Sequence, residues 1–315
     1  MNNKTLSEEE DLQLSTLFTT WLKDQDHSPA TVRNYQSDLN HFKRWFEQAN
    51  AEPLSPAQLT PTDVREYRQH MLSVERRKAS TINRRLSALS AYSRWAQEAG
   101  FLDYNPTDRV QTVSIQPRAP RWLDKKEQAS LLRELELLRN AARTDHARFR
   151  ALRDQTVVIL MLNTGLRIGE VCNLVVSDLL ITARKGQLLV REGKGGKQRF
   201  VPLNLEARRV IGEWLPERAV WLTNLDMQEA HLFITHLGER LGSRSIQKMI
   251  TQVGQRAGIS LSCHALRHTF AKNLVNAGVS LEKVAALLGH SNLNTTRVYI
   301  VPGQQDLERA VEALV

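Results

Sequence analysis

The chain has 315 residues, of which 41% are hydrophobic, and a formal net charge of +9. This length favours two domains, and the hydrophobic content is enough for packed cores, which excludes wholesale disorder. The positive charge favours a polyanionic partner, of which nucleic acid is the commonest. A basic protein without such a partner remains open, because net charge alone does not separate the two.

Cysteine usage and hydropathy indicate a cytosolic protein. Cys172 and Cys263 are the only cysteines and lie far apart, so neither a disulfide framework nor a cysteine zinc site is expected. The segment from Met1 to Asp11 is polar and acidic, unlike a signal peptide. The longest apolar stretch, 156–162, is too short to span a bilayer.

The first part of the chain predicts an all-helical domain over residues 11–104, after a flexible lead at 1–10. Apolar residues recur there with helical spacing, and turn residues interrupt the pattern. The expected helices are about 12–23, 29–48, 60–72 and 80–99. The aromatic residues of these helices are best interpreted as core.

The polar faces of this domain are basic, and we expect Arg33, Asn83 and Arg84 to contact DNA. Ser80 or Thr81 is expected to cap the last helix, which places Asn83 and Arg84 in its first turn. That position favours contacts to phosphates and to base edges. A solvated basic surface without a ligand is the alternative, since charge runs usually mark one.

A linker is expected between this domain and a second one. Residues 105–121 hold few apolar side chains and end on two prolines, which indicates an extended segment. The second domain, 122–315, is mostly helical with three strand-like runs that suit an antiparallel sheet. These runs are 178–181, 187–191 and 198–202. The predicted fold class is therefore mainly α with a small antiparallel sheet.

Arg167 stands at the end of a predicted buried helix, in the run Thr164-Gly165-Leu166-Arg167-Ile168-Gly169-Glu170. A guanidinium at a helix–turn junction can point into a cleft and bind phosphate oxygens with its paired donors. The alternative is a surface ion pair between Arg167 and Glu170.

Lys194 lies in Gly193-Lys194-Gly195-Gly196-Lys197, between two strand-like runs. A lysine on a glycine-flanked hairpin can reach a phosphate and protonate a leaving oxygen as a general acid. Lys197 competes for that role. An ordinary solvated hairpin tip is the alternative.

His264, Arg267 and His268 are spaced to share one face of a helix. The two histidines also suit a zinc site, but no glutamate lies between them and no acidic third ligand is evident. No metal is therefore expected. A structural histidine is the alternative interpretation of His268.

His290 follows Leu288-Gly289, which is typical of a helix end with glycine in the left-handed conformation. A histidine that caps the preceding helix is the alternative. Tyr299 comes nine residues later, where a packing tyrosine with a wet hydroxyl is the alternative to a nucleophile.

Taken in order, these residues resemble the tyrosine recombinase (phage integrase) family, particularly its short, Xer-like bacterial members. That family has an arginine, a hairpin lysine, an HxxR motif, a histidine or tryptophan, and then a tyrosine. The matching positions are Arg167, Lys194, His264, Arg267, His290 and Tyr299. The resemblance covers nearly the whole chain, with the first domain similar to the family's core-binding domain and the second to its mixed α+β catalytic domain.

The resemblance implies a site-specific DNA recombinase that works through a 3′-phosphotyrosyl intermediate, without ATP, metal or any other cofactor. It implies Tyr299 as nucleophile, Arg167 and Arg267 as phosphate ligands and Lys194 as general acid. His264 would orient the phosphate or accept the tyrosine proton, and His290 would bond a non-bridging oxygen.

The implied partner is double-stranded DNA with a specific recombination site, gripped by both domains. Arg244 and Gln247 are the expected DNA contacts of the second domain. The family assembles as a tetramer on DNA, here either of identical chains or with a related recombinase. Apolar residues at helical spacing in 305–315 suit a helix that docks on the next protomer, with intramolecular packing as the alternative.

Three other functions compete with this interpretation. A type IB topoisomerase shares the chemistry but relaxes DNA, and the compact first domain and the exchangeable tail disfavour it. A DNA-binding protein without catalysis would not need the complete residue set. A zinc hydrolase would depend on a metal.

Overall fold

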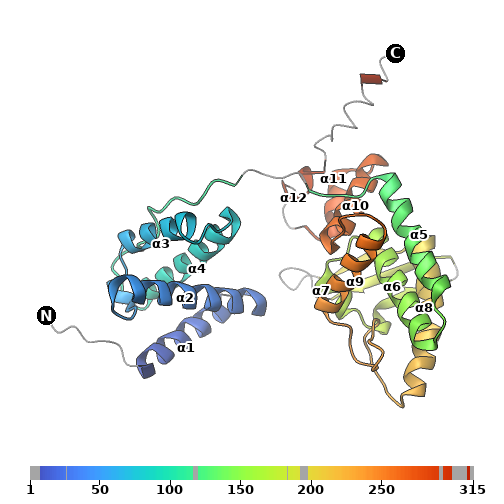
Figure 1. The fold of residues 1–315 in the computed structure, drawn as a ribbon, viewed down its shortest axis with the longest axis horizontal. Helices are drawn as coiled ribbons and strands as arrows, with labels where there is room; N and C mark the ends of the chain where they lie inside the picture. Colours follow the sequence, from blue (N-terminus) through green and yellow to red (C-terminus); the bar gives the residue numbers. More distant parts are fainter. Residues whose placement is uncertain are drawn as a thin grey trace. The chain divides into compact units, whose positions relative to one another are not determined.

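The computed structural model describes residues 8–25, 27–115, 120–182, 184–191, 198–290, 294–299 and 311–312. The chain divides into two compact units, Met1–Pro117 and Arg118–Val315. Figure 1 shows helices α1 to α4 in the first unit and α5 to α12, with the sheet, in the second. No described helix is both long and apolar enough to cross a membrane.

The first unit is a bundle of four helices around an aromatic core. Its elements are α1 (Glu8–Asp24), α2 (Pro29–Asn50), the 3-10 turn η1 (Pro56–Gln58), α3 (Pro61–Ser73) and α4 (Ala79–Glu98). Phe18, Phe42 and Tyr67 are at most 1% exposed, and the ring of Phe42 meets that of Tyr67 edge to face. The prediction that these aromatic residues form a core is confirmed.

Two helix starts differ from those predicted. α1 begins at Glu8, so the end of the expected flexible lead is helical. α4 begins at Ala79 with Lys78 as its N-cap and no capping side chain, so the prediction of Ser80 or Thr81 as the cap is wrong. An uncapped start carries no sequence signal. It moves Asn83 and Arg84 beyond the first turn of α4.

Part of the expected linker packs on the first unit. Val110 and Val113 lie against the aromatic core. The side-chain amide of Asn83 donates to the carbonyl of Val113 and accepts from its backbone N–H, both at 2.8 Å. Residues 105–113 therefore belong with the first unit.

The second unit surrounds the buried helix α6. Its helices are α5 (Lys125–Ala141), α6 (Asp145–Thr164), α7 (Ile168–Asn173), α8 (Leu205–Asn224), α9 (Ser243–Arg256), α10 (Cys263–Asn276), α11 (Leu281–Leu288) and α12 (Asn294–Arg297), with the 3-10 turn η2 (Val176–Asp178). α6 packs against α5, α8 and α10. Apolar residues on all sides of its second half, 156–162, explain the central place of α6, since a helix segment that is hydrophobic all round is buried.

An antiparallel sheet follows α7, as predicted. Its strands are β1 (Leu179–Ile181), β2 (Gly186–Val190) and β3 (Arg199–Pro202), in the order β1-β2-β3. Leu188 and Val201 are paired across β2 and β3 and both are buried, so this face of the sheet joins the core. The mainly helical fold class with a small antiparallel sheet is confirmed.

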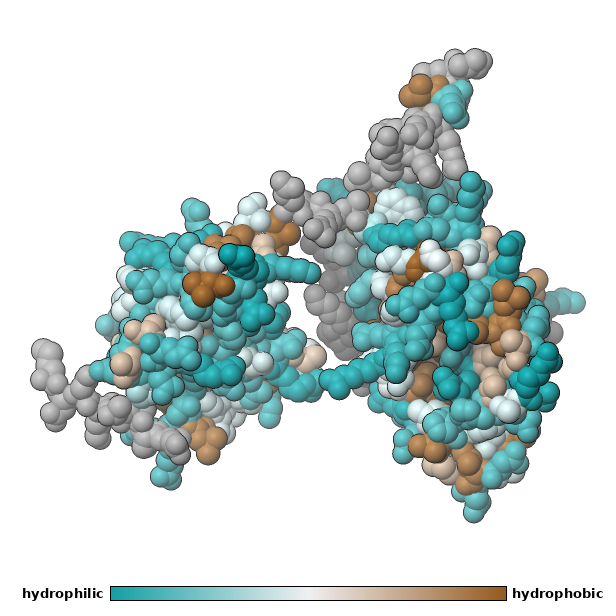
Figure 2. All heavy atoms as spheres, in the orientation of Figure 1, coloured by the Kyte–Doolittle hydropathy of each residue, from teal (hydrophilic) through white to brown (hydrophobic). Residues whose placement is uncertain are grey.

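The last helices form a smaller apolar cluster beside the main core. Phe270 of α10, Val284 and Leu288 of α11 and Tyr299 pack together. Hydrophilic side chains cover most of the visible face of each unit (Figure 2). The cluster fixes where α11 and Tyr299 lie against α10.

Candidate active site

The turn between α6 and α7 fixes Arg167. Gly165 caps α6 in the left-handed conformation, with φ of 63°. A Cβ there would lie 2.4 Å from Cδ1 of Phe270, so both the backbone and the neighbouring ring require glycine. The backbone N–H and Nη1 of Arg167 donate to the Glu170 carboxylate at 2.8 and 2.9 Å. The ion pair considered from the sequence therefore exists, and Arg167 still lines a cavity.

Arg267 is buried on α10, with 4% of its surface exposed. Its Nη1 donates to the carbonyl of Gly165 at 2.5 Å and its Nη2 to that of Leu288 at 2.7 Å. Burial lowers the pKa of Arg267 to about 10, and nearby Arg167 adds to this effect, so the group stays charged at neutral pH. A buried cation bonded to neutral carbonyls favours an anion beside it.

Three consecutive carbonyls at the end of α11 accept hydrogen bonds from three different arginines. The pairs are Arg199 Nε to Leu287 (3.1 Å), Arg267 Nη2 to Leu288 (2.7 Å) and Arg167 Nη2 to Gly289 (3.2 Å). The last carbonyls of a helix lack partners within the helix and carry its partial negative charge. These carbonyls bind three guanidinium groups, and those of Arg167 and Arg199 are also paired with Glu170. The cluster keeps a net positive charge.

Arg199 was missed by the sequence analysis. It opens β3, and alternation along the strand places its side chain on the same face as buried Val201. An arginine on the inward face of a strand needs a buried partner, which here is Glu170. That alternation is the signal from which Arg199 could have been found.

The ring of Tyr299 is buried, and the residue also lines the cavity. Tyr299 is 1% exposed and packs with Phe270 and Leu288. Its hydroxyl is hydrogen-bonded to Nδ1 of His268 at 2.6 Å. Burial raises the pKa of Tyr299, while the two arginines of the cavity oppose the rise. The ring of Tyr299 therefore has the packing role considered from the sequence. Its hydroxyl is held by His268.

Of the two histidines on α10, His268 contacts Tyr299 directly, whereas His264 is exposed. Burial lowers the pKa of His268 to about 4, with further lowering by His264 and Arg267. His268 is therefore neutral at pH 7 and able to accept a hydrogen bond from the phenol. Its place beside Tyr299 was not anticipated, because helical spacing does not say which histidine meets a residue far along the chain.

His290 follows Gly289, which ends α11 with φ of 65°, as predicted. Its Nδ1 is hydrogen-bonded to Oγ1 of Thr296 at 2.9 Å, and Thr296 is fully buried. Burial lowers the pKa of His290 to about 4, and the charges of nearby arginines add to this. Since Nδ1 is bonded to Thr296, Nε2 is the nitrogen that would meet a ligand.

The predicted catalytic residues of the described chain line one cavity of about 500 Å³. They are Arg167, His264, Arg267, His290 and Tyr299. His268 lines the same cavity. Lys194 lies in 192–197, outside the described residues, as does the predicted exchange helix 305–315 except for residues 311–312. The cavity combines a cationic cluster with one phenolic hydroxyl.

The described parts of the chain hold two free thiols and no candidate metal centre. No three histidine, cysteine, aspartate or glutamate side chains lie there in a group that could hold a metal ion. Cys172 and Cys263 are buried free thiols, and burial raises the pKa of Cys263 to about 11. Cys263 is therefore protonated at neutral pH.

Two of the three predicted DNA contacts of the first unit, Arg84 and Asn83, have partners within the protein. Arg84 is paired with the buried carboxylate of Asp38, although its side chain is 45% exposed. The Asn83 amide bonds Val113 with both its oxygen and its nitrogen. These bonds hold residues 105–113 on the first unit. A contact of Asn83 with DNA stays a prediction.

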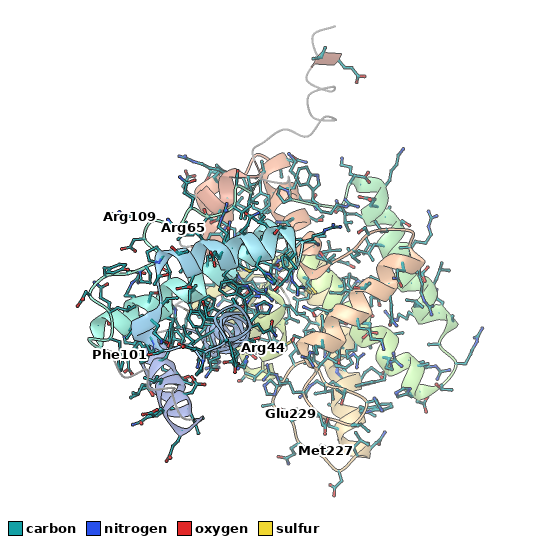
Figure 3. The ribbon with its side chains drawn as sticks, turned by 60° about the vertical axis from the view of Figure 1, so that its left-hand side comes forward. Arg44, Arg65, Phe101, Arg109, Met227 and Glu229 are labelled. Atoms are coloured by element: carbon teal, nitrogen blue, oxygen red, sulfur yellow. The ribbon has the colours of Figure 1, made fainter. Side chains whose placement is uncertain are left out.

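The other predicted DNA contacts are exposed. Arg33 lies on α2, and Arg244 and Gln247 lie on α9. Further exposed arginines of the first unit are Arg44, Arg65 and Arg109 (Figure 3). Exposed arginine side chains, which could bind a polyanion, therefore lie on both units.

Two family models match the chain along most of its length. Residues 121–305 match the model described as the phage integrase family. Residues 16–100 match the phage integrase N-terminal SAM-like domain. The chain belongs to the phage integrase family. The resemblance inferred from the order of the motif residues along the chain is confirmed.

Similar proteins carry the name tyrosine recombinase XerC. One from Pseudomonas fluorescens is 32% identical over 275 residues, which cover 86% of this chain and 85% of that protein. One from Lactobacillus delbrueckii subsp. bulgaricus is 28% identical and covers 94% of this chain and 96% of its own length. The prediction of an enzyme of the tyrosine recombinase class is confirmed, and none of the alternative functions gains support.

Solved structures of the same fold include DNA complexes. A XerH site-specific recombinase bound to palindromic difH substrate matches with a TM-score of 0.73 and 20% identity, over 99% of this chain and 90% of that one. A lambda integrase dimer bound to a COC′ core site matches with a TM-score of 0.67 and 20% identity, over 91% and 94%. At such identities the likeness concerns the fold.

Proposed function

We propose that the chain is a site-specific recombinase that cleaves and rejoins double-stranded DNA through a 3′-phosphotyrosyl intermediate, without ATP or metal. The observation that carries the proposal is the cavity shared by Arg167, Arg267 and Tyr299. A phosphodiester bound there has two guanidinium groups for its oxygens and one hydroxyl for its phosphorus. The name of the XerC relatives agrees with this chemistry.

The proposed reaction is an exchange of esters. Oη of Tyr299 attacks phosphorus and the bond from phosphorus to the 5′ oxygen breaks. The leaving oxygen takes a proton from Lys194 and becomes a 5′-hydroxyl, while the tyrosine proton passes to His268 or His264. In rejoining, a 5′-hydroxyl gives its proton to Lys194 and attacks the phosphotyrosine, while the tyrosine oxygen leaves and takes its proton back from the histidine. One ester replaces another at each step, so no ATP is needed.

The arginines stabilise the charge that develops on the non-bridging oxygens. Arg267 is buried and tied to two carbonyls, so it meets the phosphate without reorganisation. Arg167 is held by Glu170 and Gly289. His290 donates from Nε2 to a non-bridging oxygen, in the tautomer whose Nδ1 accepts from Thr296. Two fixed guanidinium groups take the place that metal ions hold in other phosphoryl transfers.

We further propose that both units contact the duplex and that the protein acts in the cytoplasm as a tetramer on DNA, of identical chains or with a related recombinase. Arg33, Arg84, Arg244 and Gln247 are the proposed contacts. The similar structures in complexes with DNA support a DNA partner. The tail 305–315 is the proposed exchange element between protomers.

A nicked substrate tests the function. Duplexes from the chain's own genomic neighbourhood are nicked so that the short 5′-hydroxyl strand released by cleavage diffuses away and the intermediate is trapped. Incubated with EDTA and without ATP, one duplex is expected to give a protein–DNA complex that survives denaturation. If the protein binds the duplexes but forms no covalent complex with any of them, it is a DNA-binding protein without catalysis. Equal relaxation of supercoiled plasmid lacking that site would indicate a topoisomerase.

The contact from His268 to Tyr299 gives a second expected result. His268→Leu lowers the single-turnover rate of covalent complex formation by about 10–100-fold, because the phenol loses the group that orients it and can take its proton. His268→Asn recovers part of the rate, since its amide can still bond the hydroxyl. His41→Leu is the control, because His41 makes the same contact to Tyr67 in the first unit. A His268→Leu rate within about threefold of wild type would rule this role out.

A further inference from the structure

We propose that Arg199 is a positioning residue for the phosphate-binding arginines, through Glu170 and the end of α11. The proposal rests on the proposed function and names a further residue that the same site needs. Arg199 does not line the cavity, and its side chain is 13% exposed. It therefore acts through other side chains.

The guanidinium of Arg199 has a partner on each side. Nη1 and Nη2 donate to the two carboxylate oxygens of Glu170 at 3.0 and 2.9 Å. Nε donates to the carbonyl of Leu287 at 3.1 Å. On the third side lies Gly289, where an added Cβ would stand 2.8 Å from Nη1. The group is thus held in one plane between α7 and the end of α11.

Glu170 is shared between two arginines. Its Oε1 accepts from Nη1 of Arg167 and from Arg199, and its Oε2 accepts from the backbone N–H of Arg167 and from Arg199. Burial alone would raise the pKa of Glu170, but the bonds from Arg199 and Arg167 hold it below the usual value, so the carboxylate is charged. With Arg199 absent, the whole charge of Glu170 would be paired with Arg167. The phosphate would then compete with a carboxylate for the same guanidinium.

Arg199 also links two described segments that lead to predicted catalytic residues. It opens β3, and Lys194 precedes it by five positions in the sequence, outside the described residues. Through Glu170 it reaches the turn of Arg167, and through Leu287 it reaches the helix end that precedes His290. We expect a shift of either segment to be passed to the other through this side chain. The expected consequence of its loss is a misplaced Arg167 in a folded protein.

Arg199→Lys and Arg199→Gln test the proposal, with Arg153→Lys as the matched control. Arg153 is also largely buried, with 8% of its side chain exposed, and it also bonds a carboxylate and a carbonyl, those of Asp154 and Ile234, but it does not line the cavity. Circular dichroism and thermal unfolding select the Arg199 variant that keeps the wild-type fold. Active-site titration with the trapping duplex normalises each rate to competent protein.

The single-turnover cleavage rate of the Arg199 variant is expected to fall by about 10–100-fold, as for residues that orient metal ligands, with an unchanged apparent affinity for the duplex. The decisive readout uses a duplex whose scissile phosphate is a neutral methylphosphonate. That substrate needs less charge neutralisation, so the deficit shrinks if Arg199 acts through Arg167. A general loss of packing would give the same deficit on both substrates.

Each outcome has a separate meaning. Equal deficits on the two substrates, or an Arg199 variant as active as Arg153→Lys, would overturn the positioning role while wild-type trapping upholds the recombinase. A second check is the double variant with Glu170→Gln, in which Arg199→Lys is expected to cost little further rate because the carboxylate is already gone. Additive losses would contradict the proposal. Failure of the wild-type chain to form a covalent complex would instead reject the proposed function.

Discussion

Replacing Tyr299 by phenylalanine leaves DNA binding within about twofold of wild type and abolishes the covalent complex, because the phenolic oxygen is the proposed nucleophile. The ring keeps its packing against Phe270 and Leu288, so the fold is retained. The variant loses the hydrogen bond to His268, which costs about 0.5–1.5 kcal/mol of unfolding free energy. Gel shift measures binding, and a denaturing gel measures the covalent product.

Tyr67→Phe is the control for this result. Tyr67 is a buried tyrosine whose hydroxyl is hydrogen-bonded to Nδ1 of a histidine, His41, at 2.8 Å. It lies in the first unit and lines no part of the cavity. Loss of the Tyr67 hydroxyl is expected to lower the free energy of unfolding by a comparable amount and to leave covalent complex formation unchanged. Normal covalent trapping by Tyr299→Phe would assign the nucleophile to another residue.

Arg167→Gln is expected to lower the single-turnover cleavage rate by at least about 10²–10³-fold, the usual cost of removing one donor to a developing oxyanion. The side chain is 32% exposed, so its loss affects the fold less than loss of buried Arg267. Glutamine keeps a donor but carries no charge. DNA affinity at fixed salt is expected to change much less than the rate.

Arg139→Gln is the matched control for Arg167→Gln. Arg139 is also partly exposed and paired with a carboxylate, that of Glu213 at 2.6 Å, but it lies away from the cavity. Both variants remove one positive charge and one ion pair. An Arg167→Gln rate within about tenfold of the Arg139→Gln rate would contradict the role of Arg167 in phosphate stabilisation.

Local chain geometry explains why parts of the site could be predicted from the sequence. Gly165 and Gly289 mark helix ends, and each places the residues after it at a turn beside the cavity. Helical spacing places His264 and His268 on one face of α10. Such features depend on a few neighbouring residues, which the sequence shows directly.

The missing parts depend on contacts between distant segments. Arg199 meets Glu170 and Leu287 only after β3, α7 and α11 have packed together. The same packing brings His268, rather than His264, to Tyr299. The contact of Asn83 with DNA stays a prediction, but its hydrogen bonds to Val113 could not be foreseen, because they form only when residues 105–113 fold back on the first unit. The start of α4 could not be placed because Lys78 gives no capping signal.

The location and polarity of the covalent bond test the central claim most directly. Protein trapped on the nicked duplex is digested with nuclease and protease, and the modified peptide is sequenced by mass spectrometry. The account predicts a single modified residue, Tyr299, joined to the 3′-phosphate of the cleaved strand. An adduct on any other side chain, or a phenol joined to a 5′-phosphate, would contradict it.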